Sequence, residues 1–250
     1  MSTHKDLNNK VILVTGASSG IGRATSILLS EHGAKVLLMG RSREKLIAVR
    51  NLLKGKEHGI YEFDFFNTDE IKSFVKQNFS DMTIDGIVNC AGMSPTMPFL
   101  FSTPSKLNQT LALNVLAPYE LTRMIVKHSY RSQMNIVFIA SVMGMVGEKA
   151  KSMYSLSKGA LIALTKSLAV ELSEKNIRVN AISPAVVDTP LIQNSEYYKS
   201  EKAMQKIVDK HLLGIGLDAD IAKSVLFLIS DQSRWITGHN MVVDGGYTAK

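Results

Sequence analysis

The sequence is poor in the residues that crosslink a chain or carry it across a membrane. Cys90 is the one cysteine among 250 residues, so neither an internal disulfide nor a cysteine-based zinc cage can form. A single thiol favours a reducing compartment, and we expect the cytoplasm. No apolar run reaches the ~18 residues of a membrane span, and the polar residues 1–10 lack the apolar stretch of a signal peptide. We therefore expect no membrane partner.

Several other features are missing, and each excludes a class of protein. No repeat, low-complexity segment or Pro/Gly/Ser linker divides the chain, which predicts a single domain over residues 1–250. The six histidines form no H-E-x-x-H or similar spacing, so no metal site is predicted. The lysines form no dense run with interleaved aromatics, so no nucleic-acid partner is expected. The net charge of +7 suits a phosphorylated cofactor or an acidic carrier protein, and also a plain basic surface.

Short apolar segments alternate with segments of helical spacing along the whole chain. The expected strands are residues 11–15, 35–39, 60–63, 84–89, 135–140, 177–182 and 241–243. The expected helices are residues 20–32, 42–53, 68–78, 104–130, 152–173, 196–213 and 218–230. We expect Gly33 and Thr68 to cap helices and Pro118 to kink the long one. This alternation predicts a Rossmann-like α/β fold, a doubly wound parallel sheet with helices on both faces and ligands at the carboxyl ends of its strands.

The first strand-to-helix junction is rich in glycine and reads TGASSGIG from Thr15 to Gly22. Glycines let the backbone turn tightly and let a pyrophosphate approach, and the following helix offers free N–H groups. No Gly-Lys-Ser/Thr follows, which excludes a P-loop. On its own the loop also fits an ordinary glycine-rich turn.

The end of the second strand distinguishes the two nicotinamide cofactors. Gly40 stands where an NAD site usually has an acidic residue, and Arg41 follows it. An arginine can hold a 2′-phosphate bidentately, so NADP (NADPH) is favoured over NAD. Alternatively, Arg41 and Arg43 are solvated loop charges. Asp64 could accept a hydrogen bond from the adenine amino group, and the small residues at 89–92 leave room for a ribose.

Tyr154 and Lys158 are four residues apart in a predicted helix and share one face. A nearby ammonium favours the phenolate, so we expect Lys158 to lower the pKa of Tyr154 from about 10. Tyr154 would then be a general acid/base for carbonyl chemistry, with Ser141 hydrogen-bonded to the substrate oxygen. The same spacing alone is also typical of a surface pair, so the prediction depends on the glycine loop.

The combination resembles the short-chain dehydrogenase/reductase family from Lys10 to Tyr247. The motifs that carry the resemblance are TGASSGIG at 15–22, NCAG at 89–92, Asn114 in LALNV, Ser141, YSLSK at 154–158 and VNAISP at 179–184. The resemblance implies that Tyr154 protonates the carbonyl oxygen, Lys158 holds the nicotinamide ribose, Ser141 orients the substrate and Asn114 anchors a water of the proton relay.

The resemblance also implies a set of cofactor-binding residues. They are Thr15, Gly16, Ser18, Ser19, Gly20, Ile21, Gly22, Arg41, Ser42, Asp64, Phe65, Asn89, Ala91, Gly92, Tyr154, Lys158, Pro184, Val187 and Thr189. Two positions depart from the family pattern. Ala185 replaces the usual glycine, which predicts strain or a shifted loop there. Ser19 stands where many NADP-using members have arginine, which leaves Arg41 as the main argument for NADP.

These observations predict an NADP-dependent oxidoreductase that moves a hydride between nicotinamide and a ketone or secondary alcohol. Within the family the chain is most similar to 3-oxoacyl-[acyl-carrier-protein] reductases, so the substrate is a small-molecule or acyl-carrier-bound carbonyl compound. The alternatives are a sugar, polyol, steroid or other small carbonyl compound. A catalytically silent nucleotide sensor is a third reading, but it would not need Asn114, Ser141, Tyr154 and Lys158 together.

Two further expectations concern the segments around the site. Residues 190–213, with Tyr197 and Tyr198, are expected to form a substrate lid, the alternative being a rigid surface helix. In this family the segments at 104–130, 152–173 and 235–246 pack between subunits, so a homotetramer is expected.

Overall fold

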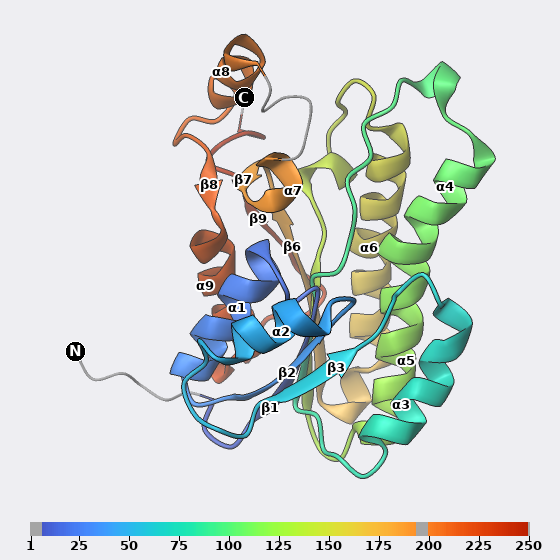
Figure 1. Cartoon of the computed structure of the whole chain (residues 1–250), viewed down its shortest axis with the longest axis vertical. Helices are drawn as coiled ribbons and strands as arrows, with labels where there is room; N and C mark the ends of the chain where they lie inside the picture. The colour runs from blue at the N-terminus through green and yellow to red at the C-terminus, as the bar shows by residue number, and fades with distance from the viewer. Residues whose placement is uncertain (1–6, 194–199, 250) are drawn as a thin grey trace.

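The computed structural model describes residues 7–193 and 200–249 of the chain. Within these ranges the central layer is a parallel sheet of seven strands, in the order β3-β2-β1-β4-β5-β6-β9 (Figure 1). Its strands are β1 (Val11–Thr15), β2 (Lys35–Gly40), β3 (Gly59–Glu62), β4 (Gly86–Asn89), β5 (Met134–Ile139), β6 (Ile177–Pro184) and β9 (Asn240–Val243). The predicted doubly wound α/β fold is confirmed.

Helices cover both faces of this sheet, which explains why its central strands β1, β4 and β5 are buried along almost their whole length. The helices α1 (Gly20–Glu31), α2 (Arg43–Arg50) and α9 (Asp218–Ile229) pack on one face, and α3 (Ile71–Phe79), α5 (Ala117–Ser129) and α6 (Ser152–Glu171) on the other (Figure 1). The remaining helices are α4 (Pro104–Leu111), α7 (Pro190–Gln193) and α8 (Glu201–Val208). None of the helices in the described ranges is both long and apolar enough to cross a membrane.

Most predicted elements lie within a few residues of their expected bounds, but one cap is wrong. Gly33 follows α1 with φ +90°, as a C-terminal cap requires. Thr68 does not cap α3; it begins a 3₁₀ turn whose N-cap is Asn67, and α3 starts at Ile71. The Asn67 N–H donates to the Asp64 carbonyl, so the chain turns before Thr68. The cap therefore falls on Asn67, one residue earlier than predicted.

The long helix predicted at 104–130 is interrupted just before Pro118. A π turn, Ala112–Leu116, separates α4 from α5, and Pro118 is the second residue of α5. Proline has no N–H, so the carbonyl of Asn114, four residues earlier, has no α-helical donor. The predicted helix is therefore interrupted before Pro118 by a π turn that contains Asn114.

The segment predicted as a helix at 196–213 is only partly helical. Helix α7 and helix α8 flank residues 194–199, so Tyr197 and Tyr198 lie outside the described residues. A separate parallel pair, β7 (Val187–Asp188) with β8 (Gly216–Leu217), was not predicted, because two-residue strands leave no periodic pattern. Figure 1 shows α7, α8 and this pair above the carboxyl ends of the sheet strands.

Candidate active site

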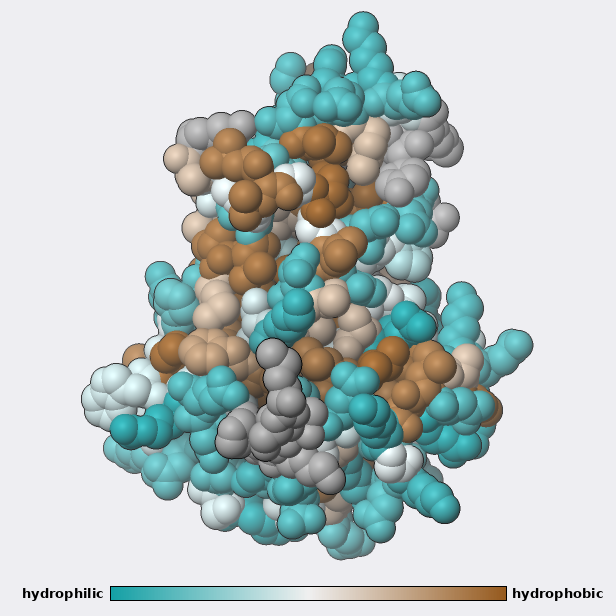
Figure 2. Space-filling view, turned by 90° about the vertical axis from the view of Figure 1, so that its left-hand side faces the viewer, coloured by the Kyte–Doolittle hydropathy of each residue, from teal (hydrophilic) through white to brown (hydrophobic). Residues whose placement is uncertain are grey.

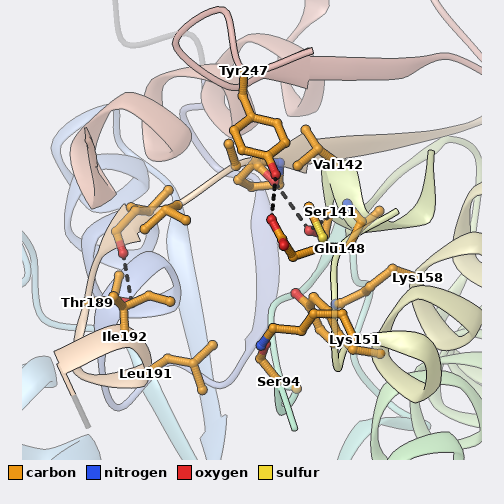
Figure 3. A pocket seen from close by; sticks show the side chains of 18 of the residues that line it. Ser94, Ser141, Val142, Glu148, Lys151, Lys158, Thr189, Leu191, Ile192 and Tyr247 are labelled. Carbon is orange, nitrogen blue, oxygen red and sulfur yellow. Dashed lines mark hydrogen bonds between the residues drawn. The ribbon is translucent and has the colours of Figure 1, made fainter. Parts of the chain in front are cut away.

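A cavity of about 390 Å³ opens where β4, β5 and β6 end. Its lining residues come from the segments after these strands, from α6, from α7 and α8, and from Tyr247. In Figure 3, Thr189, Leu191 and Ile192 lie on one side of the cavity, and Ser141, Lys151 and Lys158 lie on the other. The cavity therefore lies between the ends of the sheet strands and described residues of the segment predicted as a lid.

Ser141 and Tyr154 meet in this cavity. Ser141 is buried; its Oγ accepts from the Met143 N–H (3.2 Å) and donates to the Pro184 carbonyl (3.4 Å). Burial raises the pKa of the Tyr154 phenol, while hydrogen bonds with the Ser141 and Ser94 side chains lower it less strongly. The expectation that Lys158 would lower this pKa is wrong for this structure, because burial of the phenol is the larger effect.

Lys158 lies beneath the phenol on the next turn of α6. Its side chain is 5% exposed, and its Nζ donates to the Ile139 carbonyl at 2.6 Å. The distance from Nζ to the Tyr154 ring centroid is 5.7 Å. Burial lowers the pKa of Lys158 to about 8. At neutral pH Lys158 therefore stays mostly protonated, although burying its charge costs desolvation free energy.

Asn114 does not line the cavity, but its side chain binds Met93, which does, and Ser157 on α6. Its Oδ1 accepts from the Met93 N–H (2.8 Å), and its Nδ2 donates to the Met93 carbonyl (2.9 Å) and to Ser157 Oγ (3.0 Å). These bonds occupy the side-chain amide. The backbone carbonyl of Asn114, which Pro118 leaves without an α-helical donor, is the group that could hold a water.

The glycine loop forms a cradle that no larger residues could form. Gly16 has φ +64°, and a Cβ built on it would lie 2.9 Å from the Ala91 nitrogen. A Cβ on Gly22 would lie 2.3 Å from the Gly16 carbonyl oxygen. Ser19 caps α1 without a side-chain hydrogen bond, and the first turn of α1 contains no acidic residue. The exposed N–H groups and the dipole of α1 therefore fit the pyrophosphate of a dinucleotide.

The ends of β1 and β4 form the floor beside this loop. The Thr15 hydroxyl accepts from the N–H groups of Cys90 (3.1 Å) and Ala91 (3.0 Å), so it joins the two strands instead of pointing at a ligand. Asn89 is buried, and its Oδ1 has no hydrogen-bond partner among the described residues. A Cβ on Gly92 would lie 3.2 Å from Asn114 Oδ1, so this floor needs a small residue. An unsatisfied buried oxygen fits a ligand donor at this floor.

The residues predicted to bind the adenosine end lie around a second cavity. Arg41 and Asp64 both line it, and Arg41 is exposed. Ser42 Oγ instead caps α2 by accepting from the Lys45 N–H at 3.4 Å. The Phe65 side chain is buried in the core against Phe63, so only its backbone could contact a cofactor. The cavity at the predicted phosphate end is thus lined by one arginine, Arg41, and three carboxylates, Glu62, Asp64 and Glu70.

The segment after β6 closes the cavity from the other side. Pro184, Val187 and Thr189 line it, and Thr189 Oγ1 donates to the Val187 carbonyl (3.3 Å). A Cβ built on Gly20 would lie 3.1 Å from Thr189 Cγ2, so this segment touches the glycine loop. Ala185 does not have the positive φ that would strain it: among the described residues, Asn9, Ala150 and Asn176 are the non-glycines with positive φ. The alternative prediction, a shifted loop at Ala185, stays a prediction.

The structure also places polar residues in the cavity that sequence reasoning missed. Ser94, Glu148, Lys151 and Tyr247 line it, and in Figure 3 they point into the same space as Ser141. Lys151 had a detectable signal, because it precedes Tyr154 by three residues and so shares its helix face. Glu148 and Tyr247 are 99 residues apart, and no local pattern predicts their contact.

Comparisons with known proteins agree with this geometry. A family model described as enoyl-(acyl carrier protein) reductase matches residues 16–248. A 3-oxoacyl-[acyl-carrier-protein] reductase of Thermotoga maritima is 32% identical, with 96% of this chain and 98% of that protein covered. A glucose 1-dehydrogenase of Gluconobacter oxydans is 34% identical, with 96% and 92% covered. A crystal structure described as a short-chain alcohol dehydrogenase from Sinorhizobium meliloti superimposes with a TM-score of 0.92 at 28% identity, covering 99% of each chain.

Proposed function

Since the chain belongs to the short-chain dehydrogenase/reductase family, we propose that it is an NADP(H)-dependent oxidoreductase acting on a ketone and its secondary alcohol. One observation carries the proposal: Ser141, Tyr154 and Lys158 line the same cavity at the strand ends. A silent nucleotide sensor has no chemical need for this arrangement.

The residues of the cavity have separate tasks in the reaction. The bound nicotinamide supplies or accepts the hydride. Tyr154 Oη donates a proton to the carbonyl oxygen during reduction and takes it back during oxidation, while Ser141 Oγ orients that oxygen. Lys158 holds the nicotinamide ribose, and its ammonium stabilises the phenolate left after proton transfer. The Asn114 carbonyl anchors a water through which Tyr154 is reprotonated.

NADP is the proposed cofactor because of Arg41 at the second cavity. Its guanidinium can bind a 2′-phosphate, while Gly40 offers no carboxylate to repel one. The cofactor-binding residues are those predicted from the motifs, with Thr15, Ser42 and Phe65 acting through backbone or loop geometry.

Several classes of carbonyl compound are candidates for the substrate. A 3-oxoacyl group on a carrier protein is the first candidate, and the relatives include reductases of that substrate, a cyclopentanol dehydrogenase of Comamonas and a glucose 1-dehydrogenase. Residues 190–213 are proposed as the lid, because Leu191, Ile192 and Ile207 line the cavity.

We also propose that the protein is a homotetramer in the cytoplasm. Leu116, Tyr119, Leu156 and Val170 are exposed along the π turn, α5 and α6, and Trp235 is 92% exposed. Figure 2 shows further hydrophobic patches on the face that carries α9 and β8, between hydrophilic side chains at its top and base. Exposed apolar surface of this kind is typical of subunit contacts.

A spectrophotometric assay tests the proposal. NADPH oxidation is followed with a 3-oxoacyl-carrier thioester, free sugars and simple ketones, for the native protein and for Tyr154→Phe. We expect turnover with at least one carbonyl compound and a loss of ~10²–10⁴-fold in the variant, while NADPH binding persists. NADPH binding without turnover of any carbonyl compound supports the sensor instead.

A further inference from the structure

Ser94 brings a second serine hydroxyl to the proton-transferring phenol. It lies two residues after the NCAG motif, beyond the end of β4, and it lines the cavity. Its side chain hydrogen-bonds the Tyr154 phenol, as the side chain of Ser141 does. Figure 3 shows Ser94 beside Lys151. Tyr154 is therefore in contact with two hydroxyl groups, which come from the ends of two different strands.

The backbone on both sides of Ser94 is anchored. The Asn114 side chain binds the N–H of Met93 (2.8 Å) and also its carbonyl (2.9 Å). The Met97 N–H donates to the Ala150 carbonyl at 2.8 Å. Residues 91–98 form no helix or strand, so these bonds, and not a regular element, fix the position of the hydroxyl. A donor held in place in this way needs little reorganisation when charge develops beside it.

The partners of the Ser94 hydroxyl set the direction of its hydrogen bonds. Its Oγ accepts from Lys151 Nζ at 3.1 Å, and an ammonium can donate but not accept. Among the residues that the structure describes, the other partner of this hydroxyl is the Tyr154 phenol. A serine hydroxyl has one hydrogen, so Ser94 directs it to the phenol oxygen. The Ser141 hydroxyl, in contrast, donates to the Pro184 carbonyl.

We propose that Ser94 is a further catalytic residue, whose hydroxyl donates to the Tyr154 oxygen and stabilises the phenolate that forms when the proton leaves. This inference rests on the proposed oxidoreductase function. During reduction the O–H bond of Tyr154 breaks as its proton moves to the carbonyl oxygen of the substrate, and negative charge develops on Oη beside the Ser94 hydrogen. A hydrogen bond to an ionised acceptor is stronger than a neutral one, so Ser94 binds the phenolate more tightly than the phenol. Ser141 orients the substrate oxygen, and the two serines thus have separate tasks.

Several other titratable groups share the cavity with Tyr154. They are Cys90 after β4, Glu148 before α6, Lys151 at the start of α6, Lys158 within α6, Lys206 on α8, Lys210 after α8 and Tyr247 after β9. A test of Ser94 has to leave all of them in place. Thr96 provides the matched control, because its Oγ1 accepts from the same Lys151 Nζ at 2.7 Å, while Thr96 is exposed and absent from the cavity lining.

A pH profile of alcohol oxidation tests the proposal. The kcat for cyclopentanol and for methyl 3-hydroxybutyrate is measured with NADP⁺ from pH 6 to 10, for the native protein, Ser94→Ala, Ser94→Thr and Thr96→Val. Oxidation requires the phenolate, so kcat rises to a plateau as Tyr154 ionises. Ser94→Ala should raise the apparent pKa of this rise by about 1–2 pH units, the equivalent of one hydrogen bond to an ionised group, with a plateau near the native one. Ser94→Thr retains a hydroxyl and should keep the native pKa, as should Thr96→Val.

The other outcomes overturn the proposal. A Ser94→Ala protein that is slower at every pH with an unchanged pKa shows a structural role for Ser94. An equal shift in Thr96→Val assigns the effect to Lys151 instead of the serine.

A direct titration decides the case where neither alcohol is oxidised, which challenges the proposed function, or where the profile has no inflection in this range. The ultraviolet absorbance of the phenolate is followed in the protein with NADP⁺ added, and the signal of Tyr154 is the one that Tyr154→Phe lacks. A higher pKa of this phenol in Ser94→Ala than in the native protein supports Ser94 as its donor. Equal values, or a phenol that does not ionise, overturn it.

Discussion

Tyr247 donates a hydrogen bond to Glu148 Oε2 at 3.2 Å, and Lys210 pairs with the same carboxylate oxygen. Glu148 belongs to the loop between β5 and α6, Lys210 follows α8, and Tyr247 follows β9. Three segments far apart in the sequence are thereby joined by residues that line the cavity. Figure 3 shows the contact between Tyr247 and Glu148. We propose that this contact is a latch, which holds the proposed lid against the loop between β5 and α6.

The first prediction is that Glu148→Gln loosens this latch without unfolding the protein. The side chains of the pair are partly exposed, so its loss should lower the free energy of unfolding by no more than ~1 kcal/mol. The KM for the carbonyl substrate should rise about 2–5-fold, since the lid orders less readily. Glu120→Gln breaks the surface pair with Arg123 and should leave KM unchanged. A native KM in Glu148→Gln contradicts the latch.

The stabilisation that this latch contributes should be lost only at acidic pH. The hydrogen bond from Lys210 is the main cause that lowers the pKa of Glu148 below its ordinary 4.5. A lowered carboxyl pKa gives a stabilising contribution that is fully present above pH 4.5 and disappears as the pH falls through the lowered value. Lid closure should therefore be unaffected from pH 5 to 8.

The second prediction separates stability from activity at Lys158. Its pKa in the folded protein is about 8, below the ordinary 10.5, so between these values the unfolded chain holds the proton more tightly. The penalty is complete below pH 8 and fades as the pH rises toward 10.5. Lys158→Met should therefore increase the free energy of unfolding by about 1–3 kcal/mol at pH 7 while abolishing turnover.

Urea unfolding at pH 7 and at pH 10 measures this effect. The gain of Lys158→Met over the native protein should be larger at pH 7 than at pH 10. Lys166→Met, on the same helix, is the control; because Lys166 is exposed, the substitution should change stability little. A Lys158→Met protein that is less stable at both pH values shows that the bond to the Ile139 carbonyl outweighs desolvation.

The third prediction concerns the cofactor phosphate. Arg41→Ala should weaken NADPH binding by about 10–150-fold, because a bidentate charge-assisted contact contributes ~1.5–3 kcal/mol. NADH binding should change far less. Arg43→Ala is the matched control, since Arg43 is exposed and begins α2 but does not line the second cavity. Fluorescence titrations with both cofactors measure the constants, and equal losses for NADPH and NADH refute the phosphate assignment.

The fold and the centre of the site were predictable because their signals are local. Alternating apolar and helical segments fix a parallel sheet, and Tyr154 and Lys158 share a helix face at any tertiary arrangement. The sign of the Tyr154 pKa shift was not predictable, because it depends on how deeply the folded chain buries the phenol. The same limit applies to Phe65, a predicted cofactor residue: the sequence did not show that its side chain is buried in the core.

The polar rim of the cavity was missed for a related reason. Lys151 contacts Ser94 and Thr96 from a segment more than 50 residues earlier, and such pairings arise only from the tertiary fold. Thr15 shows a different limit. Its cofactor contact stays a prediction for the backbone, because its hydroxyl joins the ends of β1 and β4.

The last prediction tests the cofactor cradle with two glycines of opposite surroundings. A Cβ on Gly22 would lie 2.3 Å from the Gly16 carbonyl oxygen, which is backbone and cannot rotate away. Gly22→Ala should therefore displace the loop, weaken NADPH binding by more than 10-fold and destabilise the fold by ~1–3 kcal/mol. Gly147 has no atom within 4 Å of its built Cβ, and its φ is not positive. Gly147→Ala should bind NADPH normally and be as stable as the native protein or slightly more so. Native affinity in Gly22→Ala would show that the loop has slack, and the pyrophosphate would then need another anchor than the α1 N-terminus.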